Sequence, residues 1–153
     1  MAHLNILIGV AVAVFFIASQ FQARRLTARA LLIVPLVLAY FGLPGVEHLS
    51  SLDTIGFFAL NVVLALGFGL WRGFSFRVWR DGGPAWRQGT AFTLALWGAS
   101  IAARLILLAA GHLVGLSGGA AMADLPFIFA ITLGAQNLVI WLRAYPAAFA
   151  FAS

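Results

Sequence analysis

The chain has 153 residues, of which 63% are hydrophobic and only 8% are charged. Soluble globular domains carry about a quarter charged residues, so this composition excludes a water-soluble surface and indicates an integral membrane protein. The length suits a single domain over 1–153. A net charge of +5 would mark a basic surface in a nucleic-acid-binding protein. Here we interpret it as a signal of membrane orientation, and we expect no nucleic-acid partner.

Five apolar stretches predict an all-α bundle of five transmembrane helices, because irregular backbone cannot face lipid. The second stretch is the shortest and contains Pro35, which would kink a helix. A helix of about 20 apolar residues is needed to span the bilayer, so this stretch is the doubtful span. The predicted spans cover about 4–21, 28–43, 54–71, 89–114 and 125–142.

The arginines predict the orientation of these helices. A cleavable signal peptide carries its positive charge before its apolar run, whereas Arg24, Arg25 and Arg29 follow the first stretch. If the second stretch spans the membrane, this basic loop and the one over 72–87 share a side, as the positive-inside rule requires. We therefore expect a bacterial inner (plasma) membrane protein with its N-terminus outside and its C-terminus in the cytoplasm.

The loop between the third and fourth stretches predicts a short cytoplasmic β-hairpin over about 74–88. Aromatic or apolar residues alternate with polar ones before the turn sequence Asp81-Gly-Gly-Pro84. Tryptophan favours the headgroup region, so the alternative interpretation is a plain interfacial anchor. The predicted surface for a partner or an anionic lipid consists of Arg72, Arg77, Trp79, Arg80, Trp86 and Arg87.

Arg104 lies well inside the fourth stretch. An arginine at the centre of a spanning helix costs about 2.5–3.5 kcal/mol on insertion scales, so it should face the bundle interior and find polar partners. The stretch itself holds no acid, which leaves amides, carbonyls, water or a bound anion. The predicted intramembrane ligand-binding cluster is Arg104, Asn61, Gln136 and Asn137. The alternative is a structural polar clasp between helices.

His3, His48 and His112 are all expected at the outer face, and imidazole suits zinc, copper or haem iron. No two of them have the close spacing of a ligand pair, so His48 and His112 are only weak metal candidates and interfacial histidines are the alternative. A b-type haem needs two facing histidines within the bundle, which this chain does not offer. The absence of cysteine excludes thiolate chemistry within the chain. The identity of any cofactor therefore stays open.

The order of features resembles the CcdC-like family of small bacterial membrane proteins, which is associated with cytochrome c biogenesis. Three segments carry the resemblance: a basic loop before a proline-containing span (QARRLTARALLIVPLVLA), the aromatic-basic hairpin (FSFRVWRDGGPAWRQG) and an arginine-bearing span (ALWGASIAARLILL). The resemblance implies a multi-pass membrane protein of undefined activity, accessory to haem-protein maturation. A chain without cysteine cannot itself relay thiol electrons.

Together these features predict a binding or accessory subunit of a membrane complex, with the bilayer and either a membrane protein or further copies of the chain as partners. No phosphate-binding, serine-hydrolase or zinc-protease motif is present, so we predict no catalytic residue. One alternative is a small oligomeric transporter or channel subunit. The absence of a membrane-embedded acid counts against proton coupling in such a subunit. Another is a membrane enzyme that binds lipid or quinone near Arg104.

Overall fold

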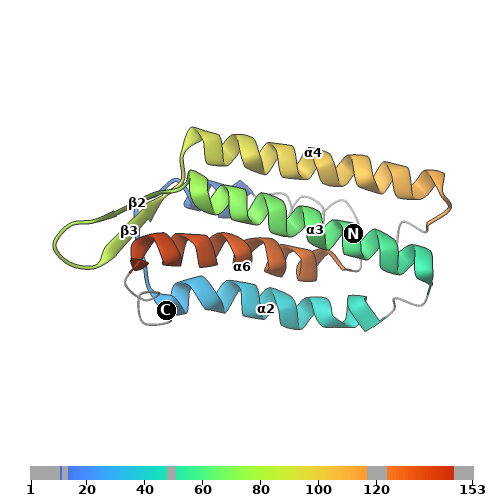
Figure 1. The fold of residues 1–153 in the computed structure, drawn as a ribbon, viewed down its shortest axis with the longest axis horizontal. Coiled ribbons are helices and arrows are strands. Elements are labelled where there is room, and N and C mark those ends of the chain that lie inside the picture. Colours follow the sequence, from blue (N-terminus) through green and yellow to red (C-terminus); the bar gives the residue numbers. More distant parts are fainter. Residues whose placement is uncertain (1–10, 12–13, 48–50, 117–123, 147–153) are drawn as a thin grey trace.

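The computed structural model describes residues 11, 14–47, 51–116 and 124–146. Four of its helices are long and apolar enough to cross a membrane. They lie side by side in one bundle (Figure 1). The predicted membrane protein with an all-α bundle is therefore confirmed at the level of these four helices, which are α2 (Ala28–Glu47), α3 (Leu52–Ser75), α4 (Ala91–Leu113) and α6 (Leu125–Ala144).

Half of the first predicted span, 4–21, lies outside the described residues, and 14–19 are helical. The second stretch, which was the doubtful one, forms the 20-residue helix α2 with Pro35 and Pro44 inside it. α3 continues to Ser75, four residues beyond the predicted end of its span. This extension matters for the site, because it places residues of the expected loop in the last turn of a helix.

α6 is the central helix of the bundle, with α2 on one side and α3 on the other (Figure 1). Two glycines of α3 permit the close approach: a Cβ at Gly69 would collide with the carbonyl oxygen of Thr132, and one at Gly73 would lie 2.5 Å from Cβ of Val139. Small residues four apart let helix backbones pack closely in membranes. Because α6 touches helices on both sides, it carries more buried residues than any other of these four helices.

The predicted hairpin is confirmed with narrower bounds and gains a third strand. β2 (Arg77–Arg80) and β3 (Ala85–Gln88) pair antiparallel, and Gly82 adopts a φ of +65° in the turn. The two-residue strand β1 (Arg24–Arg25) pairs with the other edge of β3. The two basic segments of the chain therefore lie at the same end of the bundle, as the charge pattern predicted.

The sheet is fixed to the bundle by a small apolar core at this end. Its buried members come from α6, from the start of α2, from β3 and from the residues that flank β1 and β2: Leu26, Leu31, Phe76, Ala85, Ile140 and Ala144. Arg143 adds a polar tie, because its Nη1 donates to the carbonyl oxygens of Gly73, Phe74 and Phe76 at 2.8–3.0 Å. A cation near the C-terminal end of a helix also interacts favourably with the unpaired carbonyl groups there.

Candidate functional site

Arg104 has a carboxylate partner that the sequence did not predict. Its Nη2 lies 3.5 Å from Oδ1 of Asp124, the residue that immediately precedes α6. From the sequence we expected amides, carbonyls, water or a bound anion as the partners of Arg104. The structure corrects this, because α6 begins well short of the end of α4 (Figure 1). Burial raises the pKa of Asp124 above its ordinary value, and the Arg104 guanidinium opposes that rise.

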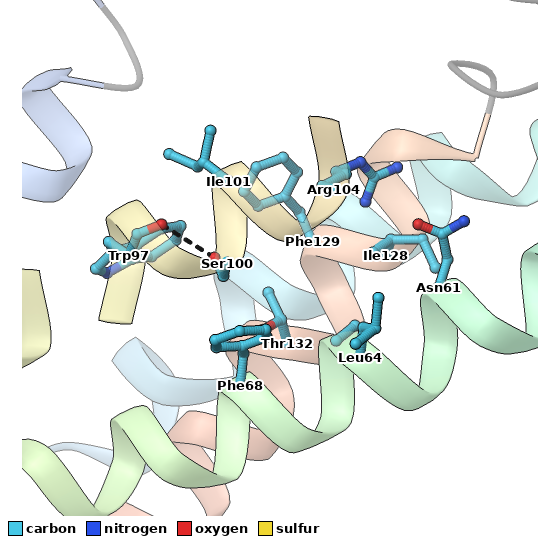
Figure 2. Close-up of a pocket in the computed structure, with 11 residues that line it drawn as sticks. Asn61, Leu64, Phe68, Trp97, Ser100, Ile101, Arg104, Ile128, Phe129 and Thr132 are labelled. Atoms are coloured by element: carbon cyan, nitrogen blue, oxygen red, sulfur yellow. Dashed lines mark hydrogen bonds between the residues drawn. The ribbon is translucent and has the colours of Figure 1, made fainter. Parts of the chain in front are cut away.

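Arg104 and Asn61 share one small cavity, with Asn61 contributed by α3 and Arg104 by α4 (Figure 2). The amide nitrogen of Asn61 donates to the carbonyl oxygen of Phe57 in its own helix, at 3.0 Å. The cavity measures about 60 Å³, whereas small-molecule pockets measure roughly 300–1,000 Å³. A space of this size suits a few water molecules, which favours the polar-clasp interpretation over a lipid or quinone site at Arg104.

Gln136 and Asn137, the other two members of the predicted cluster, do not line this cavity. Asn137 instead accepts from Nη1 of Arg87 at 3.1 Å and donates to the carbonyl oxygen of Leu31 at 2.7 Å. Gln136 donates to the side-chain oxygen of Gln20 at 3.5 Å. The predicted four-residue cluster is thus divided between two places, because equal depth in the membrane does not specify which face of a helix a residue occupies.

Arg72 is completely buried, although the sequence assigned it to a cytoplasmic surface. Its Nη2 donates to the hydroxyl of Thr132 at 2.5 Å, and its guanidinium carbon lies 3.8 Å from the ring centre of Trp97. Arg72 is buried because α3 is longer than predicted. The last helical turn includes Arg72 and directs its side chain toward α4 and α6. Arg72 therefore belongs to the bundle interior and not to the predicted docking surface.

The remaining residues of the predicted surface occupy two sides of the sheet, because side chains alternate along a strand. Val78 and Ala85 pack into the core beneath the sheet. Arg80 and Arg87 lie two residues further along the same strands, so their side chains are on the same side of the sheet. Figure 1 shows the hairpin projecting from the end of the bundle. The opposite side, which we call the outer sheet face, carries Arg25, Arg77, Trp79 and Trp86.

A larger cavity of about 280 Å³ lies between the N-terminal helical residues 14–19, α2 and α6, and the sequence did not predict it. We call it the arginine pocket. Its basic and polar lining is the feature that distinguishes it, and no acid belongs to that lining within the described part of the chain. Its principal polar residues are Arg24, Arg25, Arg87, Gln20, Gln136 and Asn137. Arg24 and Arg25 lie near Arg87 only because β1 pairs with β3.

Of the histidines, His3 and His48 lie outside the described residues, and His112 is exposed in the last turn of α4. Within the described ranges, no three His, Asp or Glu side chains lie close enough together to hold a metal ion. No protein-family model, curated protein or solved structure matches this chain.

Proposed function

We propose that this multi-pass membrane protein acts as a binding or accessory subunit, and that a protein partner docks on the outer sheet face. One observation carries the proposal: Trp79 and Trp86 are direct cross-strand partners, with Arg25 and Arg77 on the same side. The guanidinium carbon of Arg25 lies 5.4 Å from the centre of the Trp86 ring. Tryptophan and arginine are the residues most enriched at binding hot spots.

The outer sheet face is held in place before any partner arrives. Ala85 is completely buried beneath the sheet, and its carbonyl oxygen accepts from the backbone N–H of Leu26 at 2.7 Å. Arg143 ties the segment before β2 to α6. A surface that is already ordered loses little conformational freedom on binding, which supports docking by this sheet more than by a flexible loop.

Charge narrows the chemistry of the partner. Arg25 and Arg77 are exposed on the outer sheet face, so the partner that fits is an acidic protein surface with room for an indole ring. The positive-inside rule supports a cytoplasmic location for this end of the bundle, with the N-terminus outside a bacterial inner membrane. The narrower role in haem-protein maturation stays a prediction from the resemblance alone.

A photo-crosslinking amino acid at position 79, introduced in native membranes, tests the proposal. We expect a discrete protein adduct from position 79 and none from position 71, where Trp71 lies 56% exposed on α3 among the spanning helices. Arg77→Glu should abolish the adduct, because it reverses a charge on the docking side. Arg80→Glu is the matched control, because Arg80 lies on the same strand with its side chain on the other side of the sheet.

Lipid adducts alone at both positions would show that the outer sheet face is an interfacial anchor. An adduct that persists with Arg77→Glu would show that the crosslinker captures a neighbouring protein without specific binding, and it would contradict docking through this face. Loss of the adduct in both glutamate variants would indicate general charge attraction at this end of the protein.

A further inference from the structure

We propose that the arginine pocket binds the phosphate-bearing headgroup of an anionic lipid. The pocket opens on the bundle side of the sheet, opposite the outer sheet face, and among the described residues the two sites share only Arg25. Its volume of about 280 Å³ lies near the lower end of the range for small-molecule pockets, roughly 300–1,000 Å³. The space is therefore sufficient for a compact headgroup.

Two arginines of the pocket oppose each other without a counter-charge. Arg24 on β1 and Arg87 on β3 are direct cross-strand partners, and like charges in this arrangement destabilise strand pairing. Burial lowers the pKa of the Arg87 guanidinium, and the charge of Arg24 lowers it further. In the described part of the chain, the one ion pair is between Arg104 and Asp124, at the other end of the bundle. An anion between Arg24 and Arg87 would remove the repulsion.

The surroundings hold Arg87 ready for such an anion. Asn137 Oδ1 accepts a hydrogen bond from Nη1 of Arg87, and Asn137 Nδ2 donates one to the carbonyl oxygen of Leu31, which fixes the orientation of the amide. A guanidinium presents its N–H groups as a planar fork that matches two phosphate oxygens at once. The cavity is also lined by Ala30, in the first turn of α2, and the N-terminal end of a helix favours negative charge.

Apolar side chains distinguish a lipid from a free phosphate ion. The same cavity is lined by residues of the N-terminal helix, α2 and α6 that suit acyl chains: Phe16, Ile33, Val34 and Leu133. Headgroup contacts from arginine above apolar walls are the arrangement expected at the membrane surface, where basic residues attract anionic lipids. The geometry therefore assigns the phosphate to the arginines and the lipid chains to the walls below them.

The test is a lipid titration of the whole protein in mild detergent, followed by native mass spectrometry. Phosphatidylglycerol is compared with phosphatidylcholine of the same acyl chains. We expect saturable binding of phosphatidylglycerol, weakened about tenfold by Arg24→Gln with Arg25→Gln, a loss of about 1.4 kcal/mol. The matched control is Arg77→Gln with Arg80→Gln, which removes the same charge from the same end outside the pocket lining and should leave binding nearly unchanged.

A second variant separates a filled pocket from altered charge. Ala30→Trp occupies the cavity, leaves every arginine in place, and should also weaken phosphatidylglycerol binding. Arg24, Arg25 and Ala30 are exposed in the folded chain, and a circular dichroism melt confirms that each variant is folded before titration. Inorganic phosphate in excess should displace little lipid, because it has no apolar part.

Three outcomes would overturn the proposal. Equal weakening of phosphatidylglycerol binding in the pocket and control variants would show that the lipid is attracted by the net charge at this end of the bundle and not by the pocket. Equal binding of phosphatidylcholine would show a site without selectivity for anionic lipids. Complete displacement by inorganic phosphate would show that the pocket holds a free anion and that its apolar walls do not contribute.

Discussion

The guanidinium carbon of Arg72 lies 3.8 Å from the centre of the Trp97 ring, and this contact joins α3 to α4 inside the bundle. The same guanidinium reaches α6 through the hydroxyl of Thr132. A cation over an aromatic face is worth about 2 kcal/mol when it is desolvated. One arginine therefore connects three helices, and it does so without a carboxylate partner among the described residues.

Thr132→Val should destabilise the protein, because it removes the hydroxyl that accepts from the buried Arg72 and replaces it with a methyl group. The expected loss is about 1–3 kcal/mol, the usual cost of leaving a buried donor unpaired. Thr132→Ser keeps the hydroxyl and is the control. Thermal unfolding in detergent measures the difference, and equal melting temperatures for the two variants would show that the hydrogen bond contributes nothing.

Gly69→Ala should destabilise the contact between α3 and α6. The added Cβ would collide with the carbonyl oxygen of Thr132, and overpacking of this kind costs about 1–3 kcal/mol. Gly67→Ala is the matched control on the same helix, because a Cβ there meets nothing within 4 Å. Unfolding monitored by circular dichroism distinguishes them, and a loss of stability in Gly67→Ala of the same size would refute the packing explanation.

Asp124 should make the stability of the protein fall as pH rises. Burial raises its folded-state pKa above the ordinary value of 3.8, so the folded chain binds the proton more tightly than the unfolded chain. The stabilising effect of this proton is present below pH 3.8 and is lost as the pH rises through the folded-state pKa.

The measurement is the difference in melting temperature between the wild type and Asp124→Asn from about pH 4 to 7. The melting temperature of the wild type should fall relative to that of Asp124→Asn as the pH increases. Asp53→Asn removes an exposed carboxylate near the start of α3 and controls for general charge. A difference that is constant with pH for Asp124→Asn would contradict the prediction.

Gly83→Cys and Asp53→Cys should be labelled from opposite sides of the membrane. Gly83 lies in the exposed hairpin turn and Asp53 near the start of α3, at the two ends of the bundle (Figure 1). The chain has no other cysteine. A membrane-impermeant maleimide should label Asp53→Cys in intact cells and Gly83→Cys only after permeabilisation. The reverse pattern would invert the proposed orientation.

Local sequence determined the membrane character and most of the elements. An apolar run of sufficient length forms a helix in lipid because its backbone can pair only with itself, so α2, α3, α4 and α6 follow from composition. The hairpin follows from alternation and from Asp81-Gly-Gly-Pro84, whose turn chemistry depends on neighbouring residues alone. The shared side of the two basic segments follows from the distribution of arginines.

Tertiary packing decided which polar residues meet. A two-residue strand such as β1 carries no sequence signal of its own, so the meeting of Arg24 with Arg87 depends on β3. The burial of Arg72 and the pairing of Arg104 with Asp124 depend on how far each helix extends and how it is rotated. These quantities are fixed by contacts between distant segments, and a hydropathy pattern reports only what each segment does alone.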